Sequence, residues 1–192
     1  MTRSRSALRS LISSGADTIR NPCWRLDTGI SNNTGFSVDD VRCTPRYKTA
    51  ADVVIGLVDV VSKNGGLLLN IAPRADGTIP PAEQKILLEV GPWLQQYGEA
   101  IGGTRPWTVH GEGQPRPRHP STDPFVDPTR DAFTSADIRF TTRQDTSCAL
   151  VMAWPDDGQL SIRSLGHYLR SSADGPVTVE RVNPWHAGNP LG

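Results

Sequence analysis

The residues able to bind or transform a ligand are few and lie in two short stretches. Asn70 ends an apolar run, "LLLNI" over 67–71, and an amide there either faces a ligand or satisfies loop backbone. Trp24 and Asp27 lie together in "WRLDTGIS". A tryptophan ring stacks on a ligand through its apolar body or fills space. An aspartate before Thr-Gly accepts a hydrogen bond from a ligand or begins an Asx turn.

The pattern gives no support to metal chemistry. "RADG", with Asp76 and Gly77, is typical of a turn rather than of a phosphate or metal loop. Glu99 follows Gly98 at a helix end, where a bond to backbone is favoured over catalysis. The histidines stand apart, without zinc-ligand spacing, at His110, His119, His167 and His186. We therefore expect no metal site.

Charge and hydropathy limit the classes of partner. The chain has 192 residues, with 20 Lys and Arg against 20 Asp and Glu, so we expect neither nucleic acid nor a membrane as a partner. No apolar run approaches membrane-spanning length, and the basic, Ser-rich start lacks the apolar region of a secretory signal. These observations leave the cellular compartment and the oligomeric state open.

A helix, a strand and a second helix are predicted in the middle of the chain. Thr49 and Asp52 form a capping-box pair before an apolar stripe, and Asn64 with Gly65 ends that helix. The run 67–71 does not alternate, which predicts a strand covered on both faces, as in a parallel sheet under helices. The second helix follows two prolines, contains Pro92 and closes at Gly98.

The character of the sequence changes after Trp107. A Pro-rich, charged stretch predicts a linker, and beyond it apolar residues recur with period two. Strands are expected around 138–142, 148–154, 160–162 and 177–179, with a hairpin turn at "PDDG", as in a β-sandwich. Asp137 and Arg139 alternate with core positions and are expected to be solvated.

The central and C-terminal stretches are specific enough to name a resemblance. "YKTAADVVIGLVDVVSKNGGLLLNIAPRADGTIP", "WLQQYGEAIGGTRPW" and "HGEG" strongly resemble the C-terminal part of the catalytic domain of glycoside hydrolase family 29, the α-L-fucosidases. "FTSADIRFTTRQD" and "MAWPDDGQLSIRSLG" are similar to the start of that family's C-terminal β-sandwich. The resemblance covers about residues 23–182.

The resemblance implies a fold of α/β plus all-β class: the C-terminal segment of a (β/α)8-like barrel followed by a partial antiparallel β-sandwich. A whole barrel takes roughly 250 residues, so only its last segment fits before the linker. The expected domains are a poorly ordered tail over 1–22, a TIM-like glycoside hydrolase barrel segment over 23–109, a linker over 110–131 and a partial sandwich over 132–192. Asn70 lies near the carboxyl end of the expected last barrel strand, where barrel active sites are built.

The family chemistry is retaining hydrolysis, in which one carboxylate attacks the sugar and a second carboxyl protonates the leaving oxygen. The strand with the attacking aspartate has no counterpart here, so no catalytic residue is located. Many members carry the acid/base as the Glu of a Trp-Glu pair; here Trp24 matches but Arg25 follows, and Arg25 cannot donate a proton at working pH. Trp24, Asp27 and Asn70 remain as candidates for the substrate pocket.

Two functions follow as expectations. The first is an α-L-fucosidase that releases terminal α-L-fucose from glycans or glycoconjugates without a cofactor, with the isolated chain inactive. The second is a non-catalytic carbohydrate-binding or interaction remnant of such an enzyme. The expected partners are a fucosylated glycan and the remaining N-terminal portion of the barrel. Linkage preference stays open.

Overall fold

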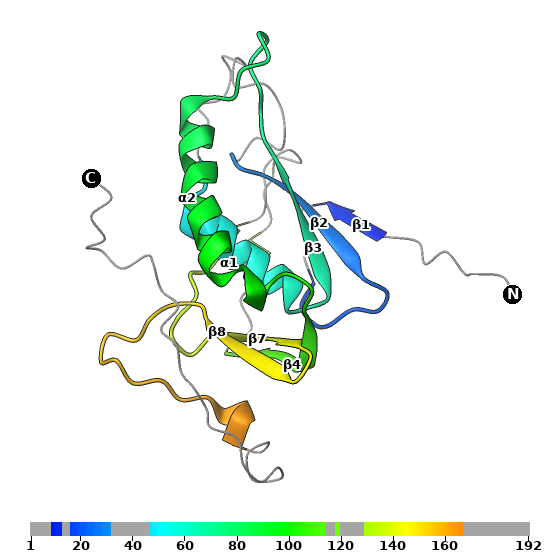
Figure 1. Ribbon diagram of the computed structural model, residues 1–192, viewed down its shortest axis with the longest axis vertical. Helices are drawn as coiled ribbons and strands as arrows, with labels where there is room; N and C mark the ends of the chain where they lie inside the picture. Colours follow the sequence, from blue (N-terminus) through cyan, green and yellow to red (C-terminus); the bar gives the residue numbers. More distant parts are fainter. Residues whose placement is uncertain (1–8, 13–15, 32–46, 114–117, 120–128, 167–192) are drawn as a thin grey trace, which may run out of the picture.

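The computed structural model describes residues 9–12, 16–31, 47–113, 118–119 and 129–166. Within these ranges it has a three-stranded parallel sheet, a three-stranded antiparallel sheet, a two-stranded ribbon and two long helices. Figure 1 shows both helices on one side of the parallel sheet, with the antiparallel sheet near the lower end of the helices. The described part is therefore α/β followed by β, and it forms no closed barrel.

The parallel sheet has the order β1-β2-β3, with strands Arg9–Ile12, Trp24–Gly29 and Gly65–Asn70. Both neighbouring pairs are parallel, and helix α1 connects β2 to β3 as a crossover. The third strand agrees with the predicted run. The sequence pattern predicted neither β1, which lies in the expected tail, nor β2.

Local signals explain the two helices. α1 spans Ala50–Val61, and the Thr49 hydroxyl accepts from the Asp52 backbone N–H while the Asp52 carboxylate accepts from the Thr49 N–H, which confirms the capping box. Asn64 has a φ of 67°, as expected at a helix end that turns into a strand. α2 spans Pro81–Tyr97 with Pro92 inside it, and a 3-10 turn, η1, follows at Gly98–Ala100.

The antiparallel sheet has the order β4-β7-β8, with strands Arg105–Glu112, Ile138–Arg143 and Thr146–Val151. The expected boundary after residue 109 falls inside β4, whose hydrogen bonds join it to β7 rather than to the parallel sheet. A short ribbon of β5, Arg118–His119, and β6, Thr129–Arg130, lies in the expected linker.

Two further strand predictions have different outcomes. Residues 155–158 form a turn, with the Gly158 N–H donating to the Pro155 carbonyl, but 160–162 form no strand. The prediction of a hairpin there is wrong, because the chain leaves the turn as a loop. The strand expected at 177–179 lies outside the described residues.

One apolar core joins the helices to both sheets. Its buried members come from α1, α2, β8 and the residues beside them: Ile30, Ala50, Val53, Val54, Val58, Ile86, Val90, Trp93, Leu150 and Met152. Leu69 and Ile71, at the end of β3, pack against this core. The antiparallel sheet is therefore packed against the same helices that cover the parallel sheet.

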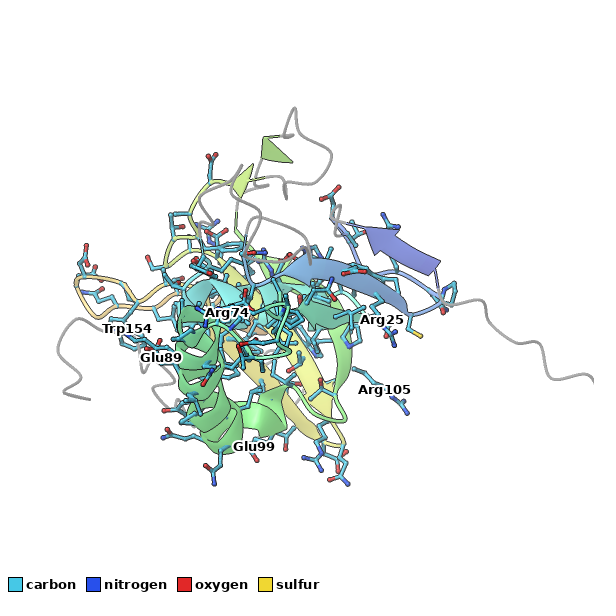
Figure 2. The ribbon with its side chains drawn as sticks, turned by 90° about the horizontal axis from the view of Figure 1, so that it is seen from above. Arg25, Arg74, Glu89, Glu99, Arg105 and Trp154 are labelled. Carbon is cyan, nitrogen blue, oxygen red and sulfur yellow. The ribbon has the colours of Figure 1, made fainter. Side chains whose placement is uncertain are left out.

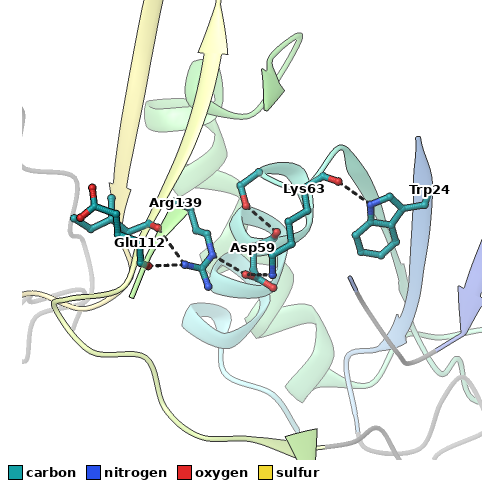
Figure 3. A network of polar contacts seen from close by, with 7 residues as sticks. Trp24, Asp59, Lys63, Glu112 and Arg139 are labelled. Carbon is teal, nitrogen blue, oxygen red and sulfur yellow. Dashed lines mark hydrogen bonds and ion pairs between the residues drawn. The ribbon is translucent and has the colours of Figure 1, made fainter. Parts of the chain in front are cut away.

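A buried ionic cluster adds to this contact between α1 and β7 (Figure 3). The Asp59 carboxylate lies 2.7 Å from both the Lys63 ammonium and the Arg139 guanidinium. Arg139 also donates to the carbonyls of Glu112 and Ile138. The expectation that Arg139 and Asp137 are solvated is wrong: they are 6% and 0% exposed, because this side of the sheet faces the helices instead of water.

Candidate functional site

The two faces of the parallel sheet differ in what covers them. Trp24, Leu26 and Leu67 pack together with Val60 of α1, so these positions face the helices. Because side chains alternate along a strand, Arg25 and Asp27 on β2 and Leu68 and Asn70 on β3 point to the opposite face. Leu68 is 42% exposed, and Arg25 is exposed as well. The prediction that both faces of β3 are covered is therefore wrong for the described residues.

The structure brings Asp27 and Asn70 together toward the carboxyl ends of β2 and β3. The Asn70 side-chain amide donates to the Asp27 carboxylate, and both residues are half-buried. Residue 27 is opposite Leu68 in the register, and Gly29 is opposite Asn70, so the pair forms diagonally across the two strands. The bond leaves a carboxylate and an amide, held against each other, on the open face of the sheet.

Lys48 closes the end of β2 beside this pair. Its ammonium donates to the Thr28 hydroxyl at 2.6 Å and to the Gly29 carbonyl. Lys48 directly precedes Thr49, so the start of α1 is tied to the end of the strand. Sequence reasoning did not single out Lys48, because nothing in its local pattern reveals a bond to a strand about twenty residues earlier.

Trp24 is mostly buried between the sheet and α1, and it also lines the cavity at the amino ends of β2 and β3. The side chain is 3% exposed, and its indole N–H donates to the Lys63 carbonyl at 2.9 Å. A Cβ on Gly65 would lie 2.7 Å from the Trp24 ring, so the ring rests directly on the backbone of β3. The ring fills space between the sheet and α1, which is the structural role that the sequence left open beside the pocket role.

Arg25, the residue at the usual acid/base position, is the second residue of β2. It therefore lies near the amino end of the strand, whereas barrel sites are built at the carboxyl ends. Figure 2 shows Arg25 and Arg105 on the side of the molecule away from α2. Nothing in this location gives Arg25 a catalytic role.

A cavity of about 240 Å³ lies at the amino ends of β2 and β3, opposite the Asp27–Asn70 pair. Its lining includes Cys23, Asn64, Thr104 and Pro106. Ligand pockets are usually about 300–1,000 Å³ and carry convergent polar groups, so this cavity is a weak candidate. We place the candidate site at the carboxyl ends instead.

Glu83 is a buried acid near those carboxyl ends, in the first turn of α2. It is 0% exposed, and its Oε2 accepts from the Ala72 N–H at 3.0 Å. Burial raises the pKa of Glu83, and the bond from Ala72 opposes that rise. One signal could have found it: Glu83 lies on the buried stripe of α2, three residues before Ile86.

The described residues hold no group of three or more His, Cys, Asp or Glu placed to bind a metal ion. In the same ranges, no helix has the length and hydropathy needed to cross a membrane. The site therefore consists of an acid–amide pair on an open parallel sheet, with a lysine and a buried glutamic acid behind it.

Comparison with known proteins shows what this segment is similar to. Residues 8–99 match the family model described as alpha-L-fucosidase. These residues are similar to α-L-fucosidases. Tissue alpha-L-fucosidase of Rattus norvegicus is 34% identical over 113 residues, which are 59% of this chain and 20% of that protein. The enzyme of Mus musculus is 34% identical over 142 residues, or 73% and 26% of the two chains.

Solved structures of α-L-fucosidases are similar to this chain. One matches with a TM-score of 0.58 and 28% identity, over 77% of this chain and 29% of its own. The Thermotoga maritima α-fucosidase in complex with fucose matches with a TM-score of 0.55 and 30% identity, over 74% and 28%. The chain thus spans between a fifth and three tenths of the length of these α-L-fucosidases.

Proposed function

We propose that this chain is the C-terminal segment of an α-L-fucosidase barrel with the beginning of its β-sandwich, and that it contributes to hydrolysis of terminal α-L-fucosides. The observation that carries the proposal is the match of residues 8–99 to the α-L-fucosidase family, in the same residues that form β1, β2 and β3. In this proposal the barrel segment runs from β1 to residue 104, and β4 begins the sandwich.

The open face of the parallel sheet supports the barrel assignment. β3 is an edge strand in the described sheet, yet it carries an apolar side chain, Leu68, on its uncovered face. Apolar edge strands are normally paired or covered, because they otherwise promote aggregation. Further barrel strands would pair with the free edges and bury Leu68 in the barrel interior. The partner we propose for this surface is the N-terminal portion of the barrel.

Asp27 and Asn70 are the residues we assign to the fucoside pocket. They lie toward the carboxyl ends of the strands on the face that becomes the barrel interior, and a carboxylate beside an amide suits hydroxyl groups of a sugar. Retaining hydrolysis needs two carboxyl groups roughly 5–5.5 Å apart. Within the described ranges the open face has one carboxylate, Asp27, so the second must come from the rest of the barrel.

The test is turnover of a chromogenic α-L-fucoside by the purified 192-residue chain. We expect none, because one carboxylate cannot supply both attack and protonation. Turnover that Asp27→Ala abolishes, while Asp156→Ala at the exposed turn leaves it intact, would show that the chain is a complete catalyst and overturn this part of the proposal.

The second candidate, a non-catalytic carbohydrate-binding remnant, is favoured by the same single carboxylate. Calorimetric titration of the chain with L-fucose separates the two. Saturable binding that depends on Asn70, without turnover even when the missing barrel portion is supplied, would select the binding remnant.

A further inference from the structure

The buried carboxyl of Glu83 has one satisfied oxygen and one that is not. Oε2 accepts the hydrogen bond from the Ala72 backbone N–H, 3.0 Å away. Oε1 is buried and has no hydrogen-bond partner among the residues that the structure describes. The Glu83 side chain is 0% exposed, so bulk solvent does not reach Oε1. A buried polar atom left unpaired is costly, so it requires an explanation.

The neutral acid lowers the cost of the unpaired oxygen. An ionised carboxylate without a cation or several donors is far more costly to bury than a protonated one. Tyr47 is a nearby titratable group: its pKa is raised by burial and, when Glu83 is ionised, by the Glu83 charge, and it is lowered by Arg74. The amino end of α2 favours a negative charge, but that effect is weaker than the loss of hydration. Burial thus favours the neutral form of Glu83, and its Oε2 fixes one backbone N–H.

The location of that N–H connects Glu83 to the candidate site. Ala72 lies two residues after Asn70, directly beyond the carboxyl end of β3. The Asn70 amide in turn donates to the Asp27 carboxylate. A side chain on α2 thus holds the chain just after the strand that carries the pocket amide.

We propose that Glu83 is a positioning residue of the fucoside pocket, which holds the chain after β3 through Ala72 and so sets the Asn70 amide against Asp27. The inference rests on the proposed function for its catalytic meaning. The positioning itself is a property of the chain and can be measured without turnover, so the two proposals fail separately.

The experiment follows the side-chain amide signals of Asn70 in the ¹⁵N-labelled full chain, assigned by comparison with Asn70→Ala. We expect these signals to shift as pH rises through the titration of Glu83. Glu83→Gln keeps a neutral acceptor for Ala72, so it should hold the signals at their low-pH position at every pH. Glu83→Ala should displace them at every pH.

Two controls make the result specific. Asp27 also contacts Asn70, so its own titration could move the Asn70 signals. The pH titration is therefore repeated in Asp27→Asn, where the shift due to Glu83 should persist. In the double variant Asp27→Asn/Glu83→Gln the shift should be lost. Glu89→Gln, on the same helix beside Lys85, should leave the Asn70 signals unchanged. Asn70 signals that titrate identically in Glu83→Gln and wild type would overturn the proposal. So would variants that lower the melting temperature without moving those signals, because that result assigns Glu83 to stability alone.

Discussion

In the buried ionic cluster, removing the charge of Asp59 should lower the free energy of unfolding much more than removing the charge of Arg139. Asp59 lies between two cations, Lys63 and Arg139, and all three side chains are at most 8% exposed. Burial by itself would raise the pKa of Asp59, but Lys63 and Arg139 together outweigh it and lower the pKa to about 2. The aspartate is therefore ionised at neutral pH and is the only negative side chain in the triad.

The magnitudes follow from which charges remain. Asp59→Asn leaves two cations buried next to each other, and breaking a buried pair in this way costs about 3–5 kcal/mol. Arg139→Met keeps the Asp59–Lys63 pair and replaces the guanidinium with an apolar chain, so its cost should be about 1–3 kcal/mol, mainly from lost hydrogen bonds. In the double variant Asp59→Asn/Arg139→Met one of the two buried cations is gone, so this variant should be more stable than Asp59→Asn alone.

The assay is urea unfolding followed by tryptophan fluorescence, which reports on buried Trp24 and Trp93. The expected order of stability is wild type, Arg139→Met, the double variant, and then Asp59→Asn. If Asp59→Asn does not fold while Arg139→Met does, the result also agrees with that order. Equal losses in the two single variants, or a double variant whose loss is their sum, would refute the reasoning, because independent residues give additive losses.

Two further changes test other contacts. Gly65→Ala places a Cβ 2.7 Å from Val60 and from the Trp24 ring, so thermal unfolding should show that the free energy of unfolding falls by about 1–3 kcal/mol. The matched Gly66→Ala, with nothing within 4 Å of its Cβ, should be near neutral. Equal effects of the two substitutions would contradict this packing. Because burial raises the folded-state pKa of Glu83, its stabilising effect is present below the unfolded value, near 4.5, and is lost as pH rises through the folded value. Urea midpoints of Glu83→Gln should therefore decline less with pH than those of wild type; parallel declines would exclude Glu83 as the cause.

Local patterns predicted the elements whose signals are local. The Thr49–Asp52 capping box, the Asn64 turn, β3 and Pro92 inside α2 all depend on residues a few positions apart, and the structure has each of them. β7 and β8 were likewise expected from their alternation. The family resemblance was also readable from the sequence, because "SKNGGLLLNI" is specific.

The misses arise where contacts are distant in sequence. β2 was not predicted, because the alternation in "WRLDTG" is short and its partners lie on β1 and β3, outside the local pattern. Arg139 looks like a solvated strand residue, since its partner Asp59 lies eighty positions earlier. The sequence left Trp24 open between stacking on a ligand and filling space, because its contacts with Lys63 and Gly65 are also distant in sequence. Of the candidate site, Asp27 and Asn70 were predicted as residues, but not their mutual bond.

The most direct test of the central claim is reconstitution of fucosidase activity from two parts. The chain is mixed with the N-terminal barrel portion of the Thermotoga maritima enzyme, from which the matching segment has been removed. We predict α-L-fucoside hydrolysis with wild-type chain and with the Asp156→Ala control, and a loss of about 10-fold or more with Asp27→Ala or Asn70→Ala, as expected for a hydrogen bond to a charged group. A stable complex of the two parts that remains inactive, or activity that both pocket substitutions leave unchanged, would contradict the account.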